Sequence, residues 1–310
     1  MDQHILLQRC KASLAGVAVG DAFGKMTEGC WPPEIEIRYG GPLTSFATPV
    51  QKNSKYTWAY AEVTDDTRFT ILVAESIISC GEVNEADMVR RILEKPIKGW
   101  PGWGEYRQQA LMGLKTARTG TGAPMRVAPI GILHRSADLE GIVRDVEMAC
   151  SCTHNSRSAL AAACAVAAAF SAAIEGLDQK TILDTAIQAA ELGNDLGDDD
   201  LCPDVARRLK WVRQYGISPA SRFRGLNPGF TAWEGAVFAL ALVYQCSSAK
   251  EAILAAANAG GDADSIASMA GGILAAKDPD GLPAEWVEIV ERENGLDLPG
   301  LAEQLFVLRH

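Results

Sequence analysis

Two short acidic segments, far apart in the sequence, have the residue types that bind divalent cations. Their six oxygen-bearing side chains are those of Thr64, Asp65, Asp66, Asp262, Asp264 and Ser265. Mg²⁺ and similar hard cations prefer several oxygen ligands, mostly carboxylates, with water completing the coordination. If the fold brings the two segments together, they would form a two-metal site that holds a substrate's hydroxyl groups and activates a water molecule.

Helix capping is the alternative explanation for both segments. Ser, Thr and Asp are the preferred N-cap residues, and acidic side chains suit the positive end of a helix dipole. An apolar helical pattern follows each segment directly. A cap needs only one acceptor, and each segment carries a surplus of carboxylates. A metal site and a pair of capped helices are therefore both open from the residues alone.

Other short motifs stand in a fixed order around the acidic segments. They are Gly16 to Gly24 (G-V-A-V-G-D-A-F-G), Glu28, Met125 to Pro129 (M-R-V-A-P) and the pair Thr153-His154. Taken with the acidic segments, this ordered set resembles the ADP-ribosylglycohydrolase family from about Leu7 to about Ala276. Each motif is short and weak alone, but the order and the compatible spacing make the resemblance specific.

The resemblance implies roles for particular residues. The six oxygen-bearing residues of the acidic segments would bind two Mg²⁺ or Mn²⁺ ions, and either Glu28 or Asp66 would act on the catalytic water. Substrate contacts would come from Trp100, Gly102, Trp103, Gly122, Met125 and His154. Asp21 is expected to hold its loop rather than to take part in the chemistry. A buried Arg126 would need an acidic partner.

The implied activity is hydrolysis of a glycosidic bond to ribose, with ADP-ribose removed from arginine or another side chain of a modified protein. Two departures from the family pattern concern the substrate, because Thr121 stands where Asn is common and the loop around Trp100 and Trp103 is bulky. A small ribosyl or nucleoside-like metabolite is therefore an alternative substrate. A non-catalytic ADP-ribose-binding member, similar to the lens crystallins that resemble this family, is a third hypothesis, which the retained carboxylates argue against.

Composition restricts the partners and the compartment. The chain has 310 residues and a formal net charge of −10, which argues against a nucleic-acid partner because such a partner requires a basic face. The uncharged run Ala159–Ile174 is short and rich in alanine, so we expect a packed central helix rather than a membrane span. The eight cysteines form no C-x-x-C pair, and a reducing cytoplasm is the expected location. The sequence does not specify the oligomeric state.

Hydrophobic spacing of three to four residues predicts an almost entirely helical chain, a single orthogonal all-α bundle over residues 1–310. The expected helices are Leu6–Val19, Thr67–Ser79, Glu85–Glu94, Tyr106–Thr116, Leu139–Cys150, Ser156–Glu175, Gln179–Leu192, Pro203–Gln214, Ala232–Gln245, Ala249–Asn258, Ser265–Ala276, Glu285–Asn294 and Gly300–Leu308. The acidic segments would begin two inner helices of this bundle, around a dinuclear metal cleft.

The longest segments expected to be irregular are 27–60, 95–104 and 216–231, and loops of such length often carry function. Trp58, Tyr60 and Trp233 lie in or beside them and could stack on a flat ligand or pack into the core.

Overall fold

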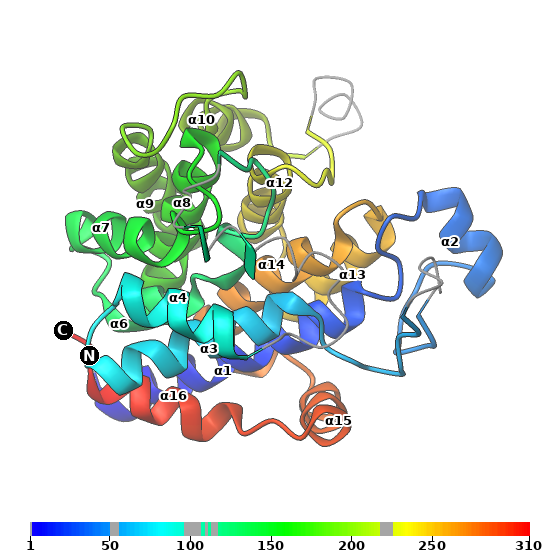
Figure 1. Ribbon diagram of the computed structural model, residues 1–310. Helices are drawn as coiled ribbons and strands as arrows, with labels where there is room; N and C mark the ends of the chain where they lie inside the picture. Colours follow the sequence, from blue (N-terminus) through cyan, green and yellow to red (C-terminus); the bar gives the residue numbers. More distant parts are fainter. Residues whose placement is uncertain (1, 50–55, 96–106, 109–110, 113–116, 218–225) are drawn as a thin grey trace.

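The protein is an all-helical bundle in the computed structural model, which describes residues 2–49, 56–95, 107–108, 111–112, 117–217 and 226–310 (Figure 1). Its α-helices are α1 (Gln3–Gly24), α2 (Pro32–Tyr39), α3 (Asp65–Cys80), α4 (Glu85–Glu94), α6 (Ala128–Leu133), α7 (Leu139–Cys150), α8 (Arg157–Ile174), α9 (Gln179–Gly193), α10 (Val205–Tyr215), α12 (Ala232–Gln245), α13 (Ala249–Ala259), α14 (Ala263–Lys277), α15 (Ala284–Asn294) and α16 (Leu298–Val307). Two short 3₁₀ turns, η1 (Pro124–Arg126) and η2 (Pro279–Gly281), accompany them. The described ranges contain no strand, so the all-α prediction is confirmed.

The sequence prediction missed two short helices. The first, α2, lies in a segment that was expected to be irregular, and it begins with two prolines whose fixed backbone angle suits a first helical turn. The carboxylate of Glu34 also accepts a hydrogen bond from the backbone N–H of Trp31 at 2.8 Å, which stabilises the start of this helix. The second, α6, has six residues with Pro129 near its start. The helix expected over Tyr106–Thr116 lies mostly outside the described residues.

Helix α8 is rich in alanine and lies inside the bundle. By length and composition it could span a membrane, but 94% of its 18-residue window is buried within the protein. Its many alanines allow α9, α12 and α14 to approach closely. The expectation of a packed central helix is therefore confirmed.

Helices α1 and α14 make the closest contact, and this contact positions the acidic residues. Gly16, Gly20 and Gly24 lie four residues apart and so share one face of α1. A Cβ atom on Gly20 would lie 2.1 Å from the carbonyl oxygen of Ala267, so only glycine permits this approach. The end of α1, with Asp21, is thereby held against the beginning of α14.

Candidate metal and catalytic centre

Asp21 joins the end of α1 to the beginning of α3. Its Oδ2 atom accepts hydrogen bonds from the backbone N–H of Thr64 at 2.9 Å, the N–H of Thr67 at 3.1 Å and the Thr67 hydroxyl at 2.5 Å. These bonds fix the first acidic segment relative to α1, which in turn is packed on α14. The prediction that Asp21 holds the local structure is confirmed, although the loop that it holds is the one before α3.

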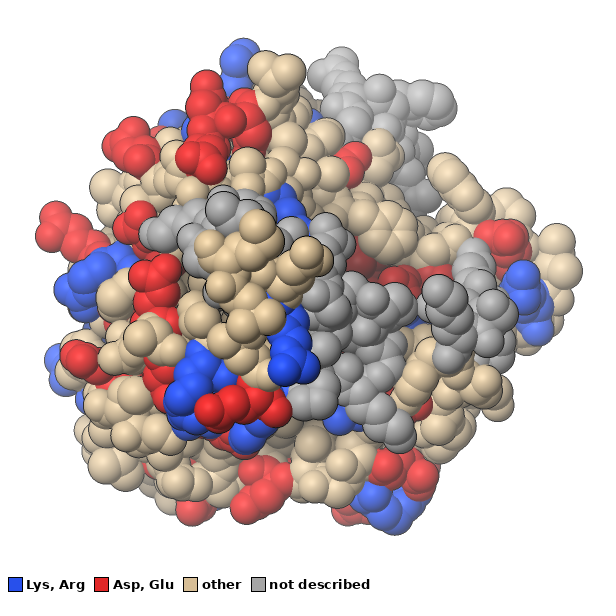
Figure 2. Space-filling model, viewed as in Figure 1, with Lys and Arg blue, Asp and Glu red and all other residues tan. Residues whose placement is uncertain are grey.

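The two acidic segments meet at this point, together with the turn that follows α1. Carboxylate oxygens of Asp21, Asp66 and Asp264 lie within 4.8 Å of one another, and so do those of Glu28, Asp262 and Asp264. Asp264 belongs to both groups. Figure 2 shows acidic side chains at the floor of a hollow right of the centre of the face in view. Elsewhere on that face, acidic and basic residues are interspersed.

Several of these carboxylates are buried without enough partners. The Oδ1 atoms of Asp21 and Asp66 are both buried with no hydrogen-bond partner among the described residues. Burial, together with the charges of Asp21 and Asp264, holds the pKa of Asp66 well above its usual range. Burial also raises the pKa of Asp21 to about 6, although the hydrogen bonds from Thr67 oppose the rise. Unpaired buried carboxylate oxygens of this kind suit Mg²⁺ or Mn²⁺.

The second segment has the same electrostatic character. Burial raises the pKa of Asp262 well above its usual range, and the charge of Asp264 adds to the effect while the Thr121 hydroxyl opposes it. In the first segment, Asp65 is half-buried, and burial with the charges of Asp264 and Asp21 raises its pKa to about 7. A divalent cation would relieve this mutual repulsion among ionised carboxylates.

Helix capping accounts for only part of these residues. The Thr64 hydroxyl caps α3 by accepting a hydrogen bond from the N–H of Asp66 at 3.3 Å, as the capping interpretation predicts. Asp262 stands at the N-cap position of α14, but its side chain makes no capping bond to the described part of the chain. Its Oδ2 atom instead accepts a hydrogen bond from the Thr121 hydroxyl at 2.6 Å. Capping therefore does not explain the placement of Asp262.

Glu28 lies in the turn after α1, beside the acidic groups. Its side chain is 32% exposed, and burial with the charge of Asp264 raises its pKa to about 7 while Lys25 opposes the rise. The Lys25 ammonium donates a hydrogen bond to Glu28 and lies 3.5 Å from Oδ2 of Asp264. Burial would lower the pKa of Lys25, but the charges of Asp264 and Glu28 outweigh it and raise the pKa.

Sequence reasoning did not identify Lys25 or Thr121 as site residues. Thr121 entered only as a departure from the family pattern. The sequence did offer a sign of a role for Lys25, because it is the one basic residue between Asp21 and Glu28. Its side chain crosses the face of Trp58, with Nζ at 4.3 Å from the ring centroid. Trp58 is thus buried against the site.

The predicted substrate-binding residues fall into two sets. Trp100, Gly102 and Trp103 lie outside the described residues. The others lie on the segment that follows Thr121 and on the chain before α8; they are Gly122, Met125 and His154.

Gly122 packs directly on the His154 ring, since a Cβ atom there would lie 2.5 Å from Cε1. His154 precedes α8 rather than beginning it, and burial lowers its pKa well below the usual range. Met125 and His154 are 4% and 2% exposed, so their side chains are buried in this structure. Their substrate role stays a prediction.

Arg126 is one of the largest fully buried side chains. Its Nη2 atom donates a hydrogen bond to the Thr153 hydroxyl at 2.6 Å, and its guanidinium lies over the Phe69 ring. These contacts tie the M-R-V-A-P segment to the Thr153-His154 pair, so two of the sequence motifs form one structural unit.

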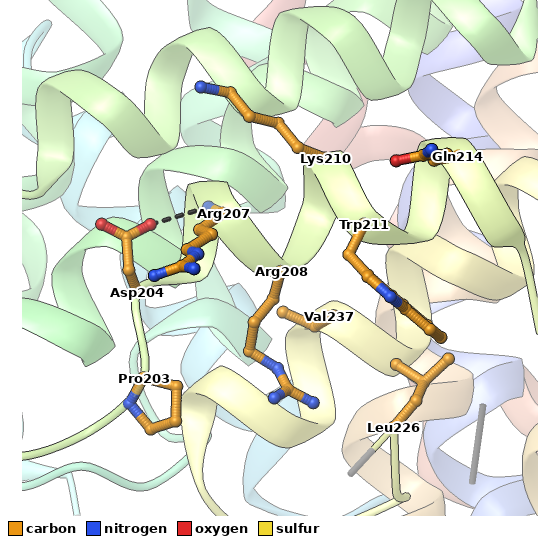
Figure 3. Close-up of a pocket in the computed structure, with 9 residues that line it drawn as sticks. All are labelled: Pro203, Asp204, Arg207, Arg208, Lys210, Trp211, Gln214, Leu226 and Val237. Atoms are coloured by element: carbon orange, nitrogen blue, oxygen red, sulfur yellow. Dashed lines mark hydrogen bonds between the residues drawn. The ribbon is translucent and has the colours of Figure 1, made fainter. Parts of the chain in front are cut away.

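Two cavities differ in their relation to the acidic groups. One, of about 470 Å³, lies between the turn after Glu28 and the loop before α12, and its lining includes Gly29, Trp31, Phe230 and Gly261. Because Gly29 and Gly261 adjoin Glu28 and Asp262, this cavity opens beside the candidate site. The other, of about 530 Å³, lies on α10 and α12 (Figure 3).

None of the nine residues labelled in Figure 3 belongs to the acidic groups. The Arg208 guanidinium in that cavity lies 4.7 Å from the Trp233 ring centroid, so Trp233 packs against protein rather than standing free.

A family model for the ADP-ribosylglycohydrolases matches residues 2–310 of the chain. The chain belongs to the ADP-ribosylglycohydrolase family. YegU, an uncharacterized protein of Escherichia coli (strain K12), is 29% identical over 297 residues, which cover 87% of this chain and 87% of YegU. The ADP-ribosylarginine hydrolase Tri1 of Pseudomonas putida (strain GB-1) is 26% identical, with 97% of this chain and 78% of Tri1 covered.

A solved structure described as an ADP-ribosylglycohydrolase-related protein complex has the same fold. Its TM-score is 0.73 at 22% identity, and the match covers 99% of this chain and 100% of that chain. The predicted family and its all-α fold are thus confirmed. The predicted enzyme class is confirmed with them: as an ADP-ribosylglycohydrolase, the protein is a hydrolase of glycosidic bonds to ADP-ribose.

Proposed function

We propose that the protein uses divalent cations to remove ADP-ribose from a modified protein, with arginine as the linked side chain. The observation that carries the metal part is the meeting of α1, α3 and α14 at a group of carboxylates, two of which bury an oxygen that has no hydrogen-bond partner among the described residues. Arginine is favoured because Tri1, an ADP-ribosylarginine hydrolase, aligns with 97% of this chain. Because all eight cysteines are free thiols, we also propose a reducing cytoplasmic location.

The metal ligands that we propose are those of the two acidic segments. They are Thr64, Asp65, Asp66, Asp262, Asp264 and Ser265. When bound, Mg²⁺ or Mn²⁺ supplies a Lewis acid that orients ribose hydroxyls and lowers the pKa of a bound water. The two carboxylate groups that could hold an ion share Asp264, so the number of ions bound depends on what else lies beside each group.

Of the two candidate bases, we propose Glu28. A general base works best with a pKa near the operating pH, and that of Glu28 is raised to about 7. Glu28 is part-exposed beside the 470 Å³ cavity, whereas Asp66 is only 2% exposed and its Oδ1 atom is buried. Glu28 would accept a proton from water as that water attacks the anomeric carbon and the bond to the guanidinium nitrogen breaks, so that the arginine leaves as a neutral guanidine, which then takes up a proton.

The competing substrate is a small ribosyl or nucleoside-like metabolite. The two substrate hypotheses are distinguished by initial rates of hydrolysis in saturating Mg²⁺. The substrates are an ADP-ribosylarginine peptide, the same peptide with ADP-ribose linked through serine, and free nucleosides. We expect the arginine-linked peptide to be hydrolysed at least about tenfold faster than the others, a difference of about 1.4 kcal/mol in transition-state binding. Equal or faster turnover of a nucleoside would replace the proposed substrate. Tight ADP-ribose binding without any turnover would instead favour a non-catalytic member.

A further inference from the structure

We propose that the Lys25 ammonium is a built-in cation of the group formed by Glu28, Asp262 and Asp264. The chain would then bind one divalent ion tightly rather than two, at Asp66 and Asp264, where the Oδ1 atom of Asp21 adds a further oxygen while its Oδ2 atom holds the chain before α3. The inference rests on the metal site of the proposed function and changes its stoichiometry.

Lys25 contacts two of the three carboxylates in its group. Its ammonium donates a hydrogen bond to Glu28 and lies 3.5 Å from Oδ2 of Asp264. Those two residues, with Asp262, are the ones whose oxygens lie within 4.8 Å of one another. The ammonium therefore stands among the oxygens that a second divalent ion would need.

The Lys25 side chain is held in this position rather than resting on the surface. It is only 11% exposed, and the α1 helix ends directly before it. The face of Trp58 lies 4.3 Å from Nζ, which stabilises the cation through the negative face of the ring. To admit a second divalent ion, Lys25 would have to give up the two carboxylates and the ring contact at the same time.

The two carboxylate groups are not equivalent in this respect. In the group of Asp21, Asp66 and Asp264, the Oδ1 atoms of Asp21 and Asp66 are buried and accept no hydrogen bond from the described residues. That group therefore retains free oxygens, whereas the group containing Glu28 already holds a positive charge. Because cations that share Asp264 repel each other across a few ångströms, a second divalent ion would bind beside Lys25 much more weakly.

The experiment counts Mn²⁺ ions bound to the full-length protein by equilibrium dialysis, with electron paramagnetic resonance to detect spin coupling between paired ions. No substrate is present, so the result does not depend on turnover. We expect the wild type to hold one tight Mn²⁺ with an uncoupled signal. Lys25→Met, which keeps most of the length of the side chain and removes the charge, should hold two with a coupled signal. Lys25→Arg, which keeps the charge, should hold one.

Two tight, coupled Mn²⁺ ions in the wild type would overturn the proposal, and so would a single ion in a folded Lys25→Met variant. If Lys25→Met fails to fold, the Mn²⁺ count and the spectrum of the wild type test the proposal by themselves. If the Mn²⁺ counts are as expected but no ADP-ribosyl substrate is hydrolysed, the proposed function is contradicted and the proposed role of Lys25 is supported. An absence of any Mn²⁺ binding would remove both.

Discussion

Replacing Asp66 by asparagine is expected to lower kcat/KM for ADP-ribose release at least about 100-fold, because bound metal supplies several kcal/mol of transition-state stabilisation. Asp66 contributes a buried Oδ1 atom that has no partner among the described residues, and its neighbours hold its pKa well above the usual range. Asparagine keeps the shape of the side chain and removes the charge that would attract the cation.

The same substitution should stabilise the protein when metal is removed. Since the raised pKa means that the folded state disfavours ionised Asp66, a neutral amide avoids that cost. Thermal unfolding in a chelator should therefore show a higher Tm for Asp66→Asn than for the wild type. The matched control is Asp199→Asn, whose side chain is 92% exposed and should affect neither quantity. Full activity in the Asp66 variant would contradict its assignment as a ligand.

Metal-free protein is expected to lose stability as the pH rises from 5 to 8. Folding raises the pKa of Asp21 from 3.8 to about 6, that of Asp65 from 3.8 to about 7 and that of Glu28 from 4.5 to about 7. A carboxyl whose pKa is raised by folding binds its proton more tightly in the folded state. Its stabilising contribution is complete below the unfolded pKa and is lost as the pH passes the folded one.

The free energy of unfolding in a chelator should fall by a few kcal/mol across this range, at about 1.4 kcal/mol per pKa unit. His154 acts in the opposite direction. Burial lowers its pKa, so the contribution of this one group to the free energy of unfolding rises with pH. Saturating Mg²⁺ should raise Tm most at pH 8, where the carboxylates are ionised and free to bind it. Stability that rises with pH in the chelator would contradict the account of these carboxylates as a strained, metal-requiring cluster. The measurement is thermal unfolding at half-unit pH steps with and without Mg²⁺.

The parts of the fold that sequence predicted well are the long helices with clear ends. The helix after Asn84 was expected at Glu85–Glu94 and has those bounds, because Asn84 caps it and the apolar spacing is regular. The two helices that begin at the acidic segments were also placed to within two residues at their starts. Motif order indicated that these segments meet, and the glycine-lined contact of α1 with α14 is the physical reason that they do.

The parts that sequence did not predict depend on contacts between distant residues. Helix α2 is short and rich in proline, so its pattern is indistinguishable from that of a loop until Glu34 is seen to cap it. The bond from Thr121 to Asp262 joins positions far apart in the chain, and no local pattern marks it. The position of Lys25 over Trp58 likewise arises only when the chain before α3 folds back on the end of α1.

The most direct test of a metal-dependent ADP-ribosyl hydrolase is the release of ADP-ribose from an ADP-ribosylarginine substrate by the wild-type protein. The protein is first treated with a chelator and dialysed, then assayed alone and with Mg²⁺ or Mn²⁺ added back. The account predicts almost no release from the metal-free protein and full recovery after addition of either ion. Equal release with and without added metal, from protein verified to be metal-free, would contradict the central role assigned to the acidic cluster.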